Sequence, residues 1–180
     1  MRRGIALGIL FLGPIAAEAQ GRGAPPEAAR ARAALAPLAA LVGEWEGEAR
    51  VMTGPGETIN VRQFEYVTFG AGSTVLMIRG IGREPEPPGK GEIVYEAAAM
   101  LWFDGESGKL RMRAHRAEGI AVEPDIELRP DTLIWGFPVP GGRIRYTIAY
   151  TNTSWHEVGH FLREGSPPIP TVDMRLRRVK

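Results

Sequence analysis

The sequence of 180 residues contains no cysteine. This absence excludes disulfide bonds, thiolate metal sites, iron–sulfur clusters and a thiol nucleophile, as well as lipid attachment through an N-terminal cysteine. An excess of charge of one sign is also lacking, because 22 lysines and arginines stand against 21 aspartates and glutamates. A formal charge of +1 gives no electrostatic reason to expect nucleic acid or an anionic membrane as a partner. The 23 glycines and 15 prolines argue against a protein built from long helices.

The apolar run near the N-terminus, Gly4 to Leu12, is shorter than the roughly 20 residues that a membrane-spanning helix needs. It follows the cationic start Met1-Arg2-Arg3 and precedes Ala17-Glu18-Ala19, which has the small residues that a signal peptidase reads. These features predict that residues 1–19 are a cleaved signal peptide rather than a stable membrane anchor. We therefore expect a periplasmic or secreted bacterial protein.

After a flexible leader over residues 20–26, we expect a helical segment over residues 27–42. The stretch from Glu27 to Leu35 is rich in alanine and arginine, and Pro37 then interrupts it. From residue 43 onward, short segments are separated by Gly, Pro, Asn or Asp at intervals of about ten residues, which is typical of an antiparallel sandwich or barrel. Residues 43–180 are therefore interpreted as one β domain, in which residues 120–128 are expected to form one of the strands.

Several of these segments show the two-residue alternation of strands that have one buried and one solvated face. The clearest runs of alternate apolar residues are Leu110, Met112 and Ala114; Ile144, Tyr146, Ile148 and Tyr150; and Val172, Met174 and Leu176. Because about ten meandering strands need closure or protected edges, an up-and-down arrangement is favoured. We predict an all-β fold, a single up-and-down antiparallel β-barrel with a short N-terminal helix.

Three stretches of the sequence resemble the lipocalin-like (calycin) barrels. They are Gly43-x-Trp45-x-Gly47 directly after the helical segment, Trp155-His156-Glu157-Val158-Gly159, and Met174-Arg175-Leu176-Arg177-Arg178 at the end. Over residues 38–180 the chain is similar to nitrobindin-type barrels and to small secreted bacterial barrels of unknown function. A late arginine lies across the tryptophan in such barrels, so the resemblance implies that Arg178 covers Trp45. Gly43, Trp45, Gly47 and Arg178 would then close one end of the barrel.

Nitrobindin-type barrels hold haem iron through one histidine near the end of the chain. This sequence has no histidine from Thr171 to Lys180. Haem is therefore not expected, and no cofactor is assigned to the barrel.

Residues 156–160 match the zinc-peptidase motif H-E-x-x-H. On a helix, His156 and His160 would share one face and bind Zn²⁺, while Glu157 would activate a water. The surrounding β pattern instead predicts a strand, in which the two histidines lie about 13 Å apart and cannot share a metal. A secreted zinc metallopeptidase is therefore kept as an alternative, and a protein without catalytic activity is favoured.

The interior of the predicted barrel is then the main candidate site. Six large or aromatic residues are candidates for lining a pocket there, namely Met77, Trp102, Met112, Trp135, Tyr146 and Tyr150. The interior of such a barrel is either filled by side chains or holds one small ligand. We expect a barrel that binds a small hydrophobic molecule non-catalytically. A structural or interaction barrel with a filled interior is the second alternative.

Overall fold

The computed structural model describes residues 25–85 and 91–180. The expected signal peptide over residues 1–19 and most of the leader over residues 20–26 lie outside the described residues. No helix in the described part of the chain combines the length and the apolar character that a membrane crossing requires.

The chain begins with helix α1 (Pro26–Leu35), where proline at the first helical position already has a helical φ. A 3₁₀ helix, η1 (Ala36–Leu41), continues from it, because Pro37 has no N–H for the α-helical hydrogen bond. Leu35, Leu38 and Leu41 are fully buried and attach this segment to the sheet. The predicted helical segment is thus present in two parts.

All other regular elements except the short 3₁₀ turn η2 (Ala71–Ser73) are strands. They are β1 (Gly43–Gly54), β2 (Glu57–Gly70), β3 (Val75–Arg83), β4 (Ile93–Asp104), β5 (Lys109–Arg116), β6 (Ala121–Val122), β7 (Asp125–Arg129), β8 (Thr132–Val139), β9 (Gly142–Tyr150), β10 (Ser154–Leu162) and β11 (Ile169–Arg178). Their order in the sheet is β6-β5-β4-β3-β2-β1-β11-β10-β9-β8-β7. The all-β, up-and-down antiparallel fold that the sequence predicts is therefore confirmed, with 11 strands rather than about ten.

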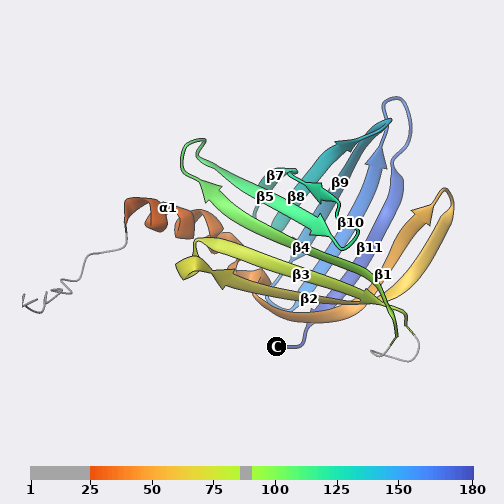
Figure 1. Ribbon diagram of the computed structural model, residues 1–180, viewed down its shortest axis with the longest axis horizontal. Coiled ribbons are helices and arrows are strands. Elements are labelled where there is room, and N and C mark those ends of the chain that lie inside the picture. Colours follow the sequence, from red (N-terminus) through yellow and green to blue (C-terminus); the bar gives the residue numbers. More distant parts are fainter. Residues whose placement is uncertain (1–24, 86–90) are drawn as a thin grey trace, which may run out of the picture.

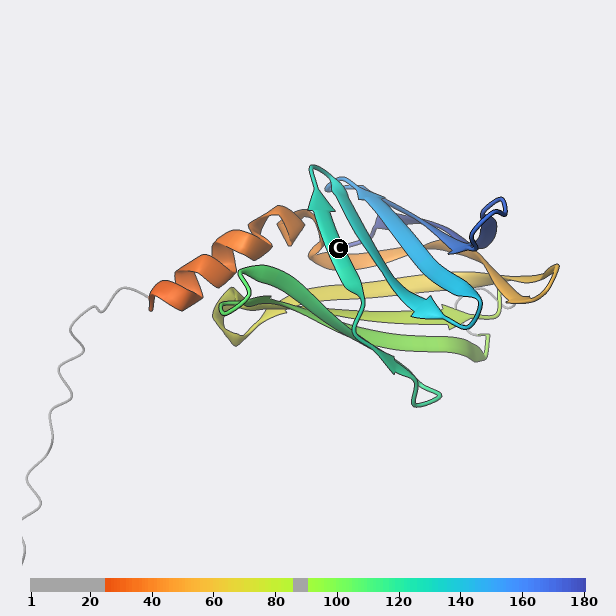
Figure 2. The ribbon, with the colours of Figure 1, turned by 90° about the horizontal axis from the view of Figure 1, so that it is seen from above.

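The sheet curls over on itself, so that β2 to β5 and β8 to β11 form two facing layers (Figures 1 and 2). The pairing of β1 with β11 joins the first strand to the last, with Trp45 opposite Arg178. The seam lies between β6 and β7, which are the two edges of the sheet. A single strand was expected over residues 120–128, but Pro124 divides it because proline cannot donate to a strand ladder. The result is an open half-barrel.

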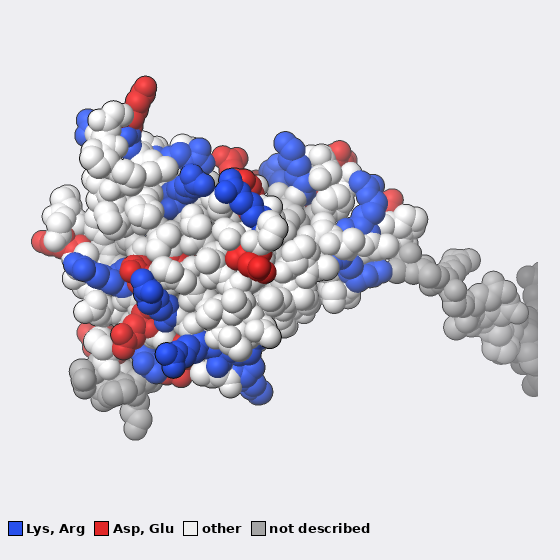
Figure 3. Space-filling model, turned by 180° about the vertical axis from the view of Figure 1, so that it is seen from behind, with Lys and Arg blue, Asp and Glu red and all other residues white. Residues whose placement is uncertain are grey.

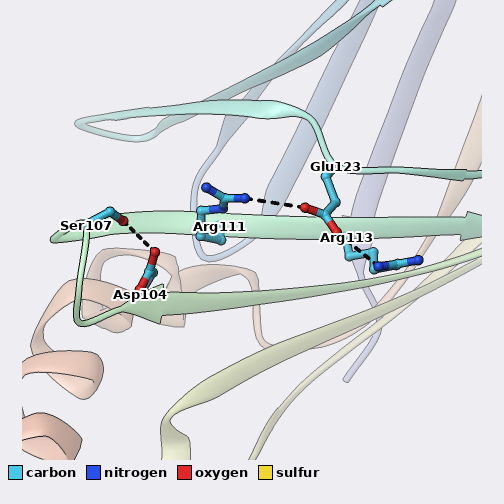
Figure 4. Close-up of polar contacts among 5 residues, drawn as sticks. All are labelled: Asp104, Ser107, Arg111, Arg113 and Glu123. Carbon is cyan, nitrogen blue, oxygen red and sulfur yellow. Dashed lines mark hydrogen bonds and ion pairs between the residues drawn. The ribbon is translucent and has the colours of Figure 1, made fainter.

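Polar contacts hold the connection between the two edge strands against β5 (Figure 4). The Glu123 carboxylate accepts from Arg113 at 3.0 Å and pairs with Arg111 at 3.4 Å. In the adjoining hairpin, the Ser107 hydroxyl donates to Asp104 at 2.6 Å. The contacts of Glu123 keep the connection between β6 and β7 beside β5, and the Ser107–Asp104 bond stabilises the hairpin between β4 and β5.

The two faces of the sheet differ sharply in composition. The inner face carries the continuous core, which includes Trp45, Leu76, Leu101, Leu133 and Leu176. On the surface seen in Figure 3, basic and acidic side chains lie interspersed. The strand alternation that the sequence predicts therefore separates a mainly apolar interior from a mixed-charge exterior.

Candidate functional site

The interior of the half-barrel contains a cavity of about 370 Å³ between the two layers of the sheet. Its walls come from β3, β4 and β5 on one side and from β8, β9 and β10 on the other, and they are mainly apolar. A larger hollow of about 560 Å³ lies over β1, β2 and β11, but it is an open groove lined by charged side chains of the outer face. The interior cavity is the one that resembles a ligand site, because apolar walls converge there around a few polar groups.

Small residues on three neighbouring strands leave the space for this cavity. Ala97 lies opposite Gly80 across the β3–β4 pair, and Ala99 lies opposite Ala114 across the β4–β5 pair. All four line the cavity. Large side chains at these four positions would fill the interior, so the alternative of a barrel with a filled interior does not fit the structure.

An aromatic wall faces these small residues. Trp135 on β8 and Tyr146 on β9 are register partners, and their rings stack with centroids 4.0 Å apart and planes inclined by 17°. Phe137 continues the wall, with its ring centroid 6.2 Å from that of Trp135. Stacked rings present a flat apolar surface that suits another flat group.

Glu65 on β2 is one of two carboxyl groups that line the cavity. Glu65 is 7% exposed, and the Gln63 side-chain amide donates to Glu65 Oε1 at 2.8 Å. Burial, followed by the negative charge of Glu157, raises the pKa of Glu65 from 4.5 to about 8. Gly80 makes room for this carboxyl, since a Cβ at residue 80 would lie 2.5 Å from Glu65 Oε1.

Glu157 on β10 supplies the second carboxyl group of the cavity and is 8% exposed. Burial raises its pKa from 4.5 to about 7, and the nearby indole N–H groups of Trp155 and Trp135 partly offset the rise. The buried Trp155 N–H nevertheless has no hydrogen-bond partner of ordinary geometry among the described residues. None of the ion pairs in the described part of the chain includes Glu65 or Glu157.

Two tyrosines complete the polar part of the cavity. Burial and the charge of Glu65 raise the pKa of Tyr95 far above its usual range, and burial and the charge of Glu157 raise that of Tyr146 to about 12. The Arg116 guanidinium lies 5.2 Å from the centroid of the Tyr95 ring. Both phenols therefore stay protonated at neutral pH and can donate hydrogen bonds to a bound molecule.

The structure places three of the six predicted pocket residues in the cavity and three elsewhere. Met112, Trp135 and Tyr146 line it. Met77 is 42% exposed on the outer face, and Trp102 follows the fully buried Leu101 on the opposite face of β4. Tyr150 is buried, but it lies at the end of the barrel beside the helical segment, where its hydroxyl donates to the Pro37 carbonyl at 3.3 Å.

The closed end of the barrel is built around Trp45, which is 1% exposed. Its indole N–H donates to the Leu41 carbonyl at 2.7 Å, and its ring meets Trp155 edge to face with centroids 5.8 Å apart. The Arg178 guanidinium lies over the Trp45 ring at 4.2 Å, which is the contact that the resemblance implies. Gly43 and Gly47 allow the close approach, because a Cβ at either position would overlap Arg178 or the backbone of Arg175.

The residues of the H-E-x-x-H motif lie on strand β10 and not on a helix. Glu157 faces the cavity, whereas the neighbouring His156 bonds Asp173 at 3.0 Å and His160 pairs in register with Arg145. Successive side chains of a strand point to opposite faces, so Glu157 cannot activate a water on a metal held by these histidines. The described residues contain no group of His, Asp and Glu that could hold a metal ion. The zinc-peptidase alternative is therefore unsupported.

No protein-family model and no curated protein matches the sequence. Among solved structures, Rv2717c from M. tuberculosis is similar with a TM-score of 0.60 and 12% identity, covering 82% of this chain and 98% of that chain. The S-type phycobiliprotein lyase CPES from Guillardia theta is similar with a TM-score of 0.55 and 11% identity, covering 87% of this chain and 98% of that chain. Both solved structures have lipocalin-like β-barrel folds, so the predicted lipocalin-like fold is confirmed, and at 11–12% identity the likeness concerns the fold alone.

Proposed function

We propose that this protein binds a small, largely apolar molecule in the cavity of its half-barrel and does not transform it. The observation that carries the proposal is the cavity itself, which has about 370 Å³ of space between aromatic and alanine-rich walls. This volume falls in the range of about 300–1,000 Å³ that is typical of ligand pockets. Two buried carboxyls and two tyrosine hydroxyls supply the few polar groups that orient a ligand in such pockets.

A fluorescence titration tests this proposal. The uncharged probe N-phenyl-1-naphthylamine should quench the emission of Trp135 and Trp155, both of which line the cavity. Ala99→Phe fills the cavity from its inner wall, and we expect it to weaken the binding about tenfold or more. Ala149→Phe is the matched control, because Ala149 is exposed on the outer face of β9. An unchanged affinity of the Ala99→Phe protein, or no binding by the natural protein, would contradict the proposal.

We also propose that the protein is exported. The support is the cationic start and the short apolar run within residues 1–19, which are features of a signal peptide. In bacterial cells, cleavage after Ala19 should produce a protein that begins at Gln20. Intact-mass measurement of the protein from a periplasmic extract checks this expectation. A protein that keeps Met1 and stays with the cytoplasmic fraction would contradict it.

A further inference from the structure

The polar part of the cavity contains two carboxyl groups that form no ion pair among the described residues. Glu65 and Glu157 lie on β2 and β10, and each has its pKa raised chiefly by burial. The other titratable groups lining the cavity are Tyr95 on β4, His115 and Arg116 on β5, and Tyr146 on β9. Arg116 lies over the Tyr95 ring and forms its ion pair with Glu118 at 2.7 Å. The two carboxyls thus share one space with no cation paired to either in the described part of the chain.

A second, independent feature lies beside Glu157. The Trp155 indole N–H borders the cavity, and Trp155 is only 2% exposed. This N–H lies near the Glu157 carboxyl, but it has no hydrogen-bond partner of ordinary geometry among the described residues. Buried polar groups in folded proteins are nearly always satisfied, so the Trp155 N–H requires an acceptor, and the Glu157 carboxyl beside it can supply one once it is ionised.

We propose that the cavity selects a flat aromatic molecule that carries one protonated amine, with the ammonium group held by Glu65 and Glu157. This inference rests on the proposed function and specifies the class of ligand. An ammonium group supplies both the missing positive charge and N–H donors for the carboxyl oxygens. The aromatic body of the ligand lies against the stacked Trp135 and Tyr146 rings. An ionised Glu157 held by the ligand can in turn accept from the Trp155 N–H.

Binding of such a cation has a consequence for the proton balance. With one ammonium between them, one carboxyl is ionised while the other keeps its proton, because two like charges in one buried space repel. The bound cation favours the ionised form, so a proton leaves the pair when the ligand binds near neutral pH. The affinity for an amine should therefore rise between pH 6 and pH 8, whereas the affinity for a neutral molecule of the same shape should not.

Isothermal titration calorimetry with three matched naphthalenes tests the inference. The ligands are 2-(1-naphthyl)ethylamine, 2-(1-naphthyl)ethanol and 1-naphthylacetate, which share one ring system and carry a cation, a neutral group and an anion. The natural protein should bind the amine about 10- to 100-fold more tightly than the alcohol, since a charge-assisted bond replaces a neutral one. The anion should bind more weakly than the alcohol.

Glu65→Gln and Glu157→Gln should each reduce the preference for the amine without reducing the affinity for the alcohol. Glu48→Gln is the matched control, because Glu48 is an exposed glutamate opposite Arg62 and Arg175 on the outer face. Equal affinities of the natural protein for amine and alcohol overturn the inference but leave the proposed function intact. A failure of all three ligands to bind overturns both. If a glutamine variant does not fold, the inference is still tested by the natural protein, through the ratio of its affinities for the amine and the alcohol and through the pH dependence of that ratio.

Discussion

The Arg178 guanidinium lies 4.2 Å from the centroid of the Trp45 ring and joins the last strand to the first. The same guanidinium donates to the carbonyls of Ala40, Val42 and Asn152. One side chain thus connects β11, the end of the 3₁₀ helix η1 and the loop before β10. It also covers the aromatic residue that fills the closed end of the barrel.

We expect Arg178→Ala to lower the free energy of unfolding by about 2–4 kcal/mol. The change removes a cation–π contact worth about 0.5–2 kcal/mol and leaves three carbonyls without their charged donor. Arg177→Ala is the control, because Arg177 is exposed on the outer face of the same strand. Urea unfolding measures both proteins. Equal stabilities of the two variants would show that the contact with Trp45 contributes nothing.

The closed end was predictable because β1 and β11 alternate cleanly. Residues Trp45, Gly47 and Ala49 share one phase of β1, and Met174, Leu176 and Arg178 share one phase of β11. The alternation in each of these two sequences is therefore enough to predict which side chains point into the barrel. The division of the expected strand over residues 120–128 was missed, although Pro124 lies inside it and proline is rare within a paired strand.

Gly47→Ala should destabilise the protein by about 1–3 kcal/mol or more, as overpacking does in a well-packed core. A Cβ at residue 47 would stand 2.0 Å from the carbonyl oxygen of Arg175, which is backbone and cannot rotate away. Gly105→Ala has open space around the added methyl group and serves as the control. Thermal unfolding followed by circular dichroism compares the two. A Gly47→Ala protein as stable as the Gly105→Ala protein would mean that β1 and β11 pack less closely than described.

The stability of the protein should fall as the pH rises from about 5 to about 8.5. The folded pKa values of Glu65 and Glu157, about 8 and about 7, lie above the ordinary value of 4.5. The folded protein therefore binds more protons than the unfolded chain in this window. The stabilisation is fully present below pH 4.5 and is lost as the pH rises through the folded values. We expect a loss on the order of 2–4 kcal/mol across the window.

Glu65→Gln isolates this effect, because its amide has nearly the shape of the carboxyl but does not ionise. The variant should be more stable than the natural protein at pH 8.5 and about equal to it at pH 5, as measured by urea unfolding at both pH values. Glu48→Gln, on the outer face, should leave the pH profile unchanged. A natural protein whose stability is constant or rises between pH 5 and pH 8.5 is incompatible with two buried carboxyls of raised pKa.

His156→Ala and His160→Ala should each change the free energy of unfolding by less than about 1 kcal/mol. The bond from His156 to Asp173 joins two half-exposed side chains, and exposed pairs of this kind contribute little. Added Zn²⁺ should shift the melting temperature of the natural protein and of the His156→Ala protein equally. A zinc-dependent rise in melting temperature that only the natural protein shows would restore the metal-site hypothesis.

The cavity was harder to predict than the fold, because the strands that form it alternate less clearly. The runs around Met77 and Trp102 are apolar on both faces, so they do not reveal which residues point inward. Glu65 was missed although β2 carries the signal, since it occupies the same phase as the buried Val61 and Val67. A glutamate in the inward phase of a strand marks a buried carboxyl. Glu157 lies within the H-E-x-x-H match, which points to a metal site that the strand geometry of β10 does not support.

Native mass spectrometry of the protein purified from its own cells tests the central claim most directly. If the cavity binds a small molecule, the natural protein and the Ala149→Phe protein should each carry one small molecule per chain, and the Ala99→Phe protein should carry none. Ala99 borders the cavity and Ala149 does not, so the comparison separates interior binding from adhesion to the surface. A natural protein that carries no small molecule, or an Ala99→Phe protein that carries the same one, would contradict the account.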